Sequence, residues 1–374
     1  MSTSSPAPKM WIGKPFNARD NSLNLLRLIL ATSVLFHHTF PIIGSHWEPV
    51  IVDDSIGGWA VIGFFTISGY LIAASRESKS FGDYLTLRIA RIFPAFLVCN
   101  LLTILAFAPI SYARHHGSLR GYLSAPTTPF SYIFENLFLK MQKYDVAATP
   151  IDVPYEGAWN GSLWTLYYEF WCYLLVGLLA CLSIYRRSVW GPTVVWALSV
   201  ALMAGLPSLS VYWQDNFDIY WLAKLVPYFM AGAILAALRK KVGMHWALAL
   251  GGIIFFLVCL FLIPRWGGQL GSVGLAYFIL WLGSVVPCPR VFQTHDVSYG
   301  MYIYAFQCQQ ICAVFGLASL GYWAFSFISL ALTIPLAIAS WFLVERPIIN
   351  RTRDALKRNQ PPREVAPAAP SAIS

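Results

Sequence analysis

Long apolar runs, separated by short polar segments, dominate this chain. A membrane-spanning helix needs about 20 predominantly apolar residues, and Pro, Gly and charged residues mark where one run stops and the next begins. Ten runs follow this pattern, at residues 23–43, 57–75, 90–111, 163–184, 191–208, 219–238, 246–263, 270–287, 298–318 and 322–344. The pattern predicts an all-α polytopic membrane protein with about ten transmembrane helices.

The composition supports this prediction. Of the 374 residues, 57% are hydrophobic and 11% are charged, whereas a soluble domain has about 25% charged residues. The net charge of +9 comes from basic residues at the ends of the predicted spans, so we expect the lipid bilayer and not nucleic acid as a partner. The seven cysteines form no Cys-x-x-Cys pair, and we expect them to pack as small apolar side chains without a metal site.

The distribution of positive charge predicts the orientation. With the N-terminus in the cytoplasm, 19 of the 26 Lys and Arg residues fall in segments on that side and five on the other. The positive-inside rule therefore places both termini in the cytoplasm. We expect residues 1–22 to form a cytoplasmic tail, residues 23–345 the membrane domain and residues 346–374 a disordered cytoplasmic tail. Residues 112–162 are expected to form a long extracytoplasmic loop, with a short interfacial helix at 131–141.

The first predicted span carries ionisable side chains, which are costly in a membrane and mark functional sites. Arg27 and His38 are eleven positions apart, which returns them to within about 20° of one helix face, while His37 lies about 80° away. This pattern favours a fixed cation at one depth and a titratable base at another. Two structural alternatives stay open: Arg27 extends to the lipid headgroups, or His38 hydrogen-bonds to a neighbouring helix.

Other predicted spans add candidate chemistry. Ser68 precedes Gly69, a small pair that allows close helix packing. Arg88 and Arg91 are i,i+3 neighbours at the start of the third span, where paired guanidinium groups suit phosphates, although ordinary cytoplasmic charge explains them equally well. Glu169 is a lone carboxylate in the fourth span and is expected to pair with a cation, His38 or Arg27.

Several segments together resemble one family, the acyltransferase family 3 membrane proteins. The Arg-x10-His spacing of Arg27 and His38 resembles the opening motif of that family, and the similarity extends over residues 23–348. The other segments that carry the resemblance are FFTISGYLI, RIARIFP, SLWTLYYEF, SYGMYIYAF and VERP. Two positions depart from the pattern. Ile62 stands where many relatives have an acid and Ala305 where many have a histidine, which leaves His38 as the principal candidate base.

The resemblance implies an enzyme that O-acylates a carbohydrate, such as an exopolysaccharide, at the outer face of a bacterial inner membrane. It implies cytoplasmic acyl-CoA as donor, with acetyl-CoA the first expectation, and His38 acting as general base or forming an acyl-imidazole. Tyr299 or Tyr302 would donate to the oxyanion. The implied roles are catalytic for His38, Glu169 and Arg27, CoA-binding for Arg88, Arg91 and Arg27, and substrate-binding for Ser68, Trp164, Tyr299 and Tyr302.

Two other classes remain as alternatives. A transporter or flippase of a lipid-linked sugar would use the same intramembrane charges without covalent chemistry. Such proteins often have internal repeats and paired broken helices, which this sequence does not show. A signalling or scaffold membrane protein is the third class. The sequence leaves the oligomeric state, the acceptor and the acyl group open.

Overall fold

The structure is a computed structural model that describes residues 10–52, 54–77, 79–182, 188–213 and 217–358. Almost all of its regular elements are helices, which confirms the all-α class. The α-helices are α1 Leu23–Ile42, α2 Ile56–Arg76, α3 Phe81–Leu102, α4 Ala108–His116, α5 Pro129–Asn136, α6 Thr165–Leu179, α8 Trp190–Trp213, α9 Phe217–Leu238, α10 Trp246–Leu262, α11 Gly267–Val285, α12 Arg290–Thr294, α13 Ser298–Val314, α14 Tyr322–Ala339 and α15 Arg346–Arg358. The remaining elements are the π-helical η1 Thr103–Phe107 and η4 Ser340–Glu345, the 3-10 turns η2 Tyr122–Ser124 and η3 Leu317–Leu320, and the strands β1 Val50–Ile51 and β2 Asp54–Ser55.

Seven helices in the described part of the chain are long and apolar enough to cross a membrane. Two more, α6 and α10, are apolar but shorter. The 17-residue α13 carries three glutamines and is buried along almost its whole length. Each predicted run overlaps a helix, and the chain is a polytopic membrane protein. The number of crossings and the cytoplasmic location of the termini stay predictions.

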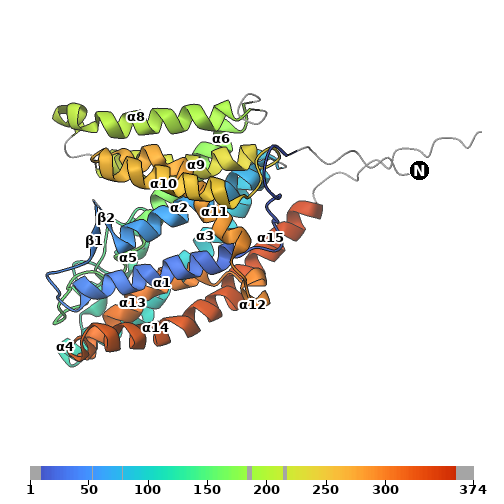
Figure 1. The fold of residues 1–374 in the computed structure, drawn as a ribbon. Helices are drawn as coiled ribbons and strands as arrows, with labels where there is room; N and C mark the ends of the chain where they lie inside the picture. Colours follow the sequence, from blue (N-terminus) through green and yellow to red (C-terminus); the bar gives the residue numbers. More distant parts are fainter. Residues whose placement is uncertain (1–9, 53, 78, 183–187, 214–216, 359–374) are drawn as a thin grey trace, which may run out of the picture.

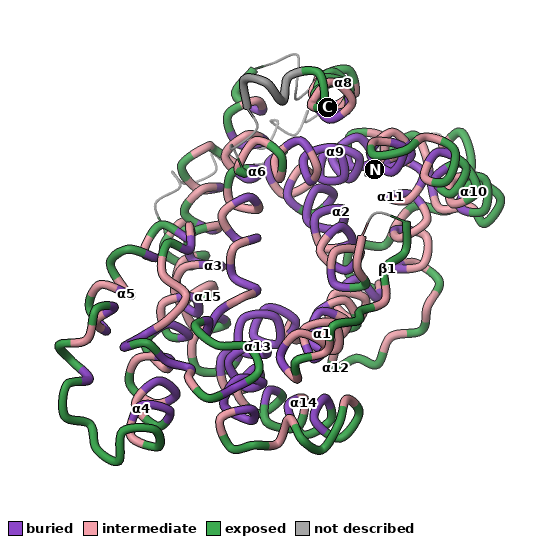
Figure 2. The backbone as a smooth tube through the Cα atoms, turned by 90° about the vertical axis from the view of Figure 1, so that its left-hand side faces the viewer, coloured by how far each residue is buried: buried purple, intermediate pink, exposed green. Residues whose placement is uncertain are grey.

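The long helices lie side by side along one direction (Figure 1). One end of the bundle carries α12, α15 and the segment that leads into α1, and we call it the terminal end. The opposite end carries β1, β2 and α4, and we call it the hairpin end. Viewed along the bundle, α1, α2, α3, α6, α9 and α13 surround the centre, while α8, α10 and α14 lie outside them (Figure 2).

Small residues bring α2 and α9 into close contact, as the Ser68-Gly69 pair predicted. A Cβ atom on Gly69 would overlap the backbone carbonyl of Phe229, and one on Gly232 would overlap that of Thr66. Backbones that approach this closely exclude any larger side chain. The contact therefore fixes how α2 lies against α9, and with it the position of the residues on either side of Gly69.

The long loop between α4 and α6 is partly helical and tied to the bundle. The expected helix at 131–141 is present in part as α5, which begins at Pro129 and ends at Asn136. The Thr128 hydroxyl caps its N-terminus by accepting from the Ser131 backbone N–H. Asn160 and Tyr132 both contact the side chain of Asn100 on α3. Buried amide and hydroxyl groups that satisfy one another hold the loop on the outside of α3.

The end of the chain requires one correction. Residues 346–374 were expected to be disordered, but residues 346–358 continue the last span through η4 into α15, which packs against α3. The helix continues because Arg346–Arg358 is strongly amphipathic, and its apolar side is half-buried although no residue of it is fully buried. The rest of the expected tail, residues 359–374, lies outside the described residues.

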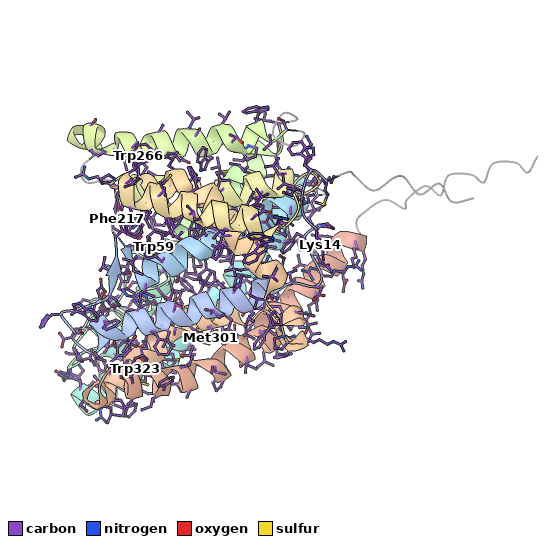
Figure 3. The ribbon with its side chains drawn as sticks, in the orientation of Figure 1. Lys14, Trp59, Phe217, Trp266, Met301 and Trp323 are labelled. Atoms are coloured by element: carbon purple, nitrogen blue, oxygen red, sulfur yellow. The ribbon has the colours of Figure 1, made fainter. Side chains whose placement is uncertain are left out.

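Aromatic side chains are conspicuous near the hairpin end. Trp59, Phe217, Trp266 and Trp323 lie toward that end, whereas Lys14 lies toward the other (Figure 3). Trp266 and Trp323 belong to the boundaries of the helices α11 and α14. Aromatic side chains at such boundaries are typical of the membrane–water interface.

Candidate active site

Helix α1 links two cavities at opposite ends of the bundle. Arg27 lines a cavity at the terminal end, and His38 lines one toward the hairpin end. Eleven residues of α-helix separate the two along the axis by about 16 Å. The predicted arrangement, a cation at one depth and an imidazole at another, is therefore present.

The cavity at the terminal end, which we call the basic cavity, has a volume of about 620 Å³. Its cations outnumber the two acids that line it, Asp83 and Asp296. The cations are Arg27, Lys79, Arg88, Arg91, Arg346, Arg353 and Lys357. A space of this size falls within the usual range for small-molecule sites. Its charge suits a ligand with several negative groups.

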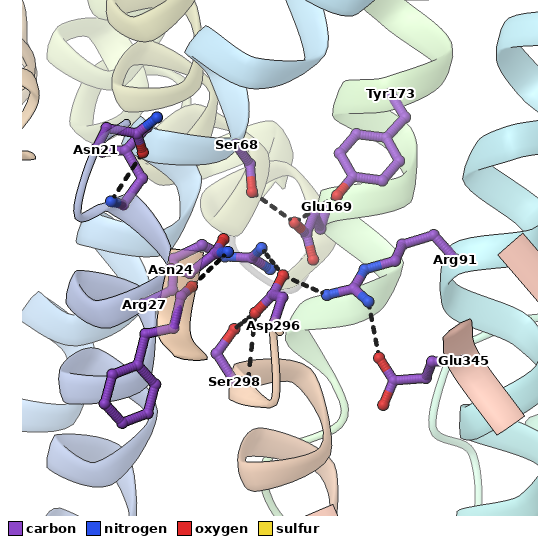
Figure 4. Close-up of polar contacts among 12 residues, drawn as sticks. Asn21, Asn24, Arg27, Ser68, Arg91, Glu169, Tyr173, Asp296, Ser298 and Glu345 are labelled. Carbon is purple, nitrogen blue, oxygen red and sulfur yellow. Dashed lines mark hydrogen bonds and ion pairs between the residues drawn. The ribbon is translucent and has the colours of Figure 1, made fainter. Parts of the chain in front are cut away.

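Asp296 is the centre of an ion-pair network beside this cavity (Figure 4). Its Oδ2 accepts hydrogen bonds from Arg27 Nη1 at 2.5 Å and from Arg91 Nη2 at 2.6 Å. Its Oδ1 accepts from the Ser298 hydroxyl at 2.5 Å. Burial by itself favours the protonated acid, but the two guanidinium groups prevail and lower the pKa of Asp296 below its ordinary value.

Glu345 extends the network to the last span. Its Oε2 accepts from Arg91 Nη1 at 2.7 Å, and its Oε1 accepts from the Ser340 hydroxyl at 3.0 Å. Arg91 thus donates to two carboxylates. Glu345 belongs to the VERP segment of the sequence, whereas Asp296 was not singled out. The available signal was an acid two residues before a span that carries several polar side chains.

The cations of the basic cavity differ in how they are satisfied. Arg27 and Arg91 each form an ion pair with Asp296, whereas no ion pair joins Arg88 to a carboxylate among the described residues. The buried Nε atoms of Arg27 and Arg88 both lack a hydrogen-bond partner there. Lys79 lies between α2 and α3, where burial and the nearby guanidinium groups of Arg88 and Arg353 lower its pKa. An anion entering the cavity would pair with the Arg88 guanidinium and would stabilise the charged form of Lys79.

His38 borders a smaller cavity of about 190 Å³, which we call the histidine cavity. Its ring lies edge-on to Phe306, with centroids 5.1 Å apart, and 5.3 Å from His37. Neither ring nitrogen hydrogen-bonds to another side chain or backbone group in the described ranges. Packing therefore positions the imidazole and leaves its lone pair open to the cavity. Trp164 and Tyr302 line the same space.

Glu169 does not have the partner expected for it. Its Oε1 accepts from the Ser68 hydroxyl at 2.8 Å and from the Tyr173 hydroxyl at 2.6 Å (Figure 4). No ion pair joins it to His38 or Arg27 within the described residues. Tyr173 is one helical turn along α6, so a local neutral donor satisfies the carboxylate instead of a distant cation. The predicted pairing with His38 or Arg27 is wrong.

The two candidate tyrosines are also engaged. The Tyr299 hydroxyl donates to the Ile92 carbonyl at 2.9 Å, and the Tyr302 hydroxyl donates to the Ser162 carbonyl at 2.7 Å. Each phenol has one proton to donate, so neither is available in this structure for an oxyanion. Tyr302 still contributes its ring to the histidine cavity, where its hydroxyl also contacts Thr165.

One aromatic side chain lies between the two ends of the site. The Phe64 ring is 5.9 Å from the guanidinium carbon of Arg27 and 5.7 Å from the Tyr302 ring. Arg27 borders the basic cavity and Tyr302 the histidine cavity. A ligand that extended from Arg27 in the basic cavity to Tyr302 in the histidine cavity would therefore pass the Phe64 ring.

The fold and site define a class: a helical membrane protein with a buried charged network and cavities at both ends of one helix. The chain belongs to the acyltransferase 3 family, whose model, described as an acyltransferase domain, matches residues 20–342. It is similar to the O-acetyl transferase of Shigella phage Sf6, with 28% identity over 90% of this chain and 98% of that protein. It is also similar to Nodulation protein 10 of Rhizobium leguminosarum bv. viciae, with 26% identity over 88% of this chain and 93% of that protein. No solved structure shows significant similarity to the chain.

Family membership makes this protein an acyltransferase and confirms the resemblance seen in its motifs. The family therefore favours the enzyme over the transporter and scaffold alternatives. The roles of individual residues stay predictions, now with the corrected geometry of Glu169, Tyr299 and Tyr302.

Proposed function

We propose that the protein transfers an acyl group, with acetyl as the first expectation, from acyl-CoA to a carbohydrate hydroxyl. The acceptor would be a surface or exopolysaccharide unit at the outer face of a bacterial inner membrane. The observation that carries the proposal is the pair of cavities at the two ends of α1, one basic and one containing an open imidazole. The name of the phage relative, an O-acetyl transferase, supports the reaction type.

The donor would bind at the terminal end, which we propose faces the cytoplasm. Arg88, Lys79 and Arg353 carry positive charge that protein carboxylates do not offset as they do for Arg27 and Arg91. They would hold the CoA phosphates. We therefore assign Arg27 and Arg91 chiefly to the ion-pair network, with phosphate contact as their secondary role. The pantetheine arm would extend past Phe64 toward His38.

The reaction would occur in the histidine cavity. His38 would accept the proton of the acceptor hydroxyl as its oxygen attacks the thioester carbonyl carbon. The tetrahedral intermediate would then break its C–S bond, and the imidazolium would return the proton to the departing CoA sulfur. The products are the sugar ester and free CoA, so atoms and charge balance. An acyl-imidazole on His38 is the alternative two-step route.

Reconstitution tests this proposal. Purified protein in liposomes is given acyl-labelled CoA on the side of the terminal end, and a saccharide is supplied on the other. We expect labelled ester on the saccharide and free CoA in equal amounts. NMR of surface polysaccharides from cells with and without the protein provides an independent measurement of missing ester groups. Movement of the saccharide without release of CoA would contradict the proposal.

The location of the donor is tested separately. Arg88→Ala removes a charge-assisted contact to phosphate, and a contact of about 1.5–3 kcal/mol corresponds to about a 10- to 150-fold weaker binding of acyl-CoA. Arg358→Ala, on the exposed end of α15, is the matched control and should leave binding unchanged. Equal affinity of the Arg88 variant and the control would show that the donor binds elsewhere.

A further inference from the structure

A second cavity adjoins the histidine cavity toward the hairpin end. It has a volume of about 630 Å³, and Asp54, Ile62 and Lys224 line both spaces. The histidine cavity, at about 190 Å³, is smaller than a typical ligand site of about 300–1,000 Å³. It therefore has room for only the reacting end of an acceptor, and the adjoining cavity has room for the rest.

A buried ion pair stands where the two cavities meet. Lys224 Nζ of α9 lies 2.7 Å from Asp54 Oδ2 of β2, and the two side chains are only 11% and 14% exposed. The ammonium group also lies over the Trp221 ring, 4.9 Å from its centroid. Desolvating such a pair costs free energy that apolar packing would not. Lys224 lies inside a predicted span, where an ionisable side chain marks a candidate functional site.

Unsatisfied polar atoms face the same place. The indole Nε1 of Trp221 is buried and has no hydrogen-bond partner in the described part of the chain. His37 Nδ1 also makes no hydrogen bond there, but it lies 3.7 Å from Glu48 Oε2. Both residues line the histidine cavity. Buried polar groups in proteins are normally paired, so an unpaired N–H at a cavity wall indicates that a bound molecule supplies its acceptor.

We propose that Asp54, Lys224 and Trp221 form the acceptor subsite, and that it takes an uncharged sugar unit. This inference rests on the proposed acyl transfer to a carbohydrate. The Lys224 ammonium donates to one sugar hydroxyl, the Asp54 carboxylate accepts from its neighbour, and the Trp221 N–H donates to a ring or hydroxyl oxygen. The hydroxyl to be acylated then enters the histidine cavity beside His38.

The charge balance of the subsite selects against acidic sugars. Lys224 and Asp54 neutralise each other, so the pair itself carries no net charge. The adjoining cavity is also lined by the exposed Arg265, so this selection applies to the sugar unit held at the pair. A uronate carboxylate would have to displace Asp54 from Lys224, or lie beside Asp54 as a like charge. A neutral hexose or deoxyhexose meets neither obstacle. These three residues are therefore positioning and specificity residues, while His38 is the proposed catalytic one.

Two variants test the subsite without leaving a lone buried charge. Trp221→Phe removes the indole N–H and keeps an aromatic ring. The double variant Asp54→Asn with Lys224→Gln replaces the ion pair by neutral amides, which avoids the penalty of an uncompensated charge. Trp171→Phe, on the exposed face of α6, is the matched control. Thermal unfolding of each purified variant establishes that it is folded.

Binding is measured by saturation-transfer NMR on protein in nanodiscs, using methyl hexopyranosides, methyl deoxyhexopyranosides and the matching methyl uronates. We expect the neutral glycosides to bind the parent protein about 10-fold more tightly than the uronates. A 10-fold difference in Kd corresponds to about 1.4 kcal/mol, which is about the free energy of one polar contact. Trp221→Phe should weaken neutral binding about 3- to 10-fold, and the double variant by more. Acyl-CoA affinity should be unchanged in all of them.

The outcomes are separable from those of the proposed function, because glycoside binding needs no acyl transfer. Uronates that bind as tightly as neutral glycosides would overturn the substrate class. Neutral glycosides that bind the variants and the parent equally, or bind none of them, would overturn the subsite. Loss of acyl-CoA binding in a folded variant would also contradict it, since that would assign these residues to the donor.

Discussion

Arg27 and Arg91 donate to the same carboxylate oxygen, Oδ2 of Asp296, at 2.5 and 2.6 Å. The two guanidinium groups come from α1 and α3, and the carboxylate precedes α13. One oxygen therefore joins three of the helices that surround the centre of the bundle. The two arginines repel each other, and the Asp296 carboxylate between them offsets that repulsion.

Asp296→Asn should destabilise the protein. The substitution leaves Arg27 without a carboxylate and Arg91 with only Glu345, and breaking a buried pair from one side costs about 3–5 kcal/mol. We expect a lower midpoint of thermal unfolding in detergent and less protein in the membrane. The control is Asp354→Asn on α15. The exposed Asp354 carboxylate lies 3.9 Å from Lys357 Nζ, and an exposed ion pair of this kind contributes about 0–1 kcal/mol. If both variants unfolded at the parent's temperature, the network would not stabilise the fold.

His38→Ala should abolish most of the acyl transfer. Loss of a positioned general base lowers kcat/KM by about 10²–10⁴-fold. Because the proposed phosphate contacts lie in the basic cavity, about 16 Å away along α1, acyl-CoA affinity should change much less than kcat/KM. The exposed His46 offers a matched His46→Ala control with parental rates. A His38 variant with full activity at normal abundance would contradict the assignment of the base.

Acyl-CoA affinity should fall as pH rises, through Lys79. Burial and neighbouring guanidinium groups lower the pKa of Lys79 in the free protein, so it loses its proton below the ordinary lysine value of about 10.4. Bound phosphate favours the charged form, and affinity is therefore greatest below the lowered pKa and lost above it. Lys79→Arg keeps its charge, so its titration of Kd against pH should be flatter. Identical slopes for parent and variant would exclude Lys79 from the donor site.

Gly69→Val should disrupt the packing of α2 on α9. A Cβ at this position overlaps the Phe229 carbonyl, and overpacking typically costs about 1–3 kcal/mol. We expect a lower unfolding temperature and less acyl transfer, since Ser68 and its bond to Glu169 would move. At Gly251 on α10 a Cβ meets open space, so Gly251→Ala should be neutral or slightly stabilising. Equal stability of the two variants would show that α2 and α9 separate without penalty.

Local sequence pattern was enough to predict most of the helices. It also predicted that Arg27 and His38 lie on one face of α1 at different depths. Apolar runs of membrane length have few alternatives to a helix, because lipid cannot satisfy backbone hydrogen bonds. The spacing of Arg27 and His38 fixed their common face by helical geometry alone. The same reasoning missed α15, where the apolar stripe is narrow and the residues are mostly charged.

Pairings between helices could not be predicted in this way. Glu169 was expected to meet a cation, but Ser68 and Tyr173 reach it first. Asp296 was not singled out, yet it holds both Arg27 and Arg91. The partner that each charged side chain binds depends on distances between segments far apart in sequence. Helix packing sets these distances, and local sequence pattern does not.

The sequence by itself determined that this chain is a helical membrane protein of the acyltransferase 3 family with a cation and an imidazole on one helix face. The tertiary structure alone decided which charges are already paired and which remain open to a ligand. Asp296 forms ion pairs with Arg27 and Arg91 inside the fold, whereas Arg88 has no ion pair and Trp221 has an unpaired N–H in the described part of the chain. The His38 imidazole borders a cavity. The reason is physical: a charge or N–H is available for chemistry only where folding has brought no partner to it.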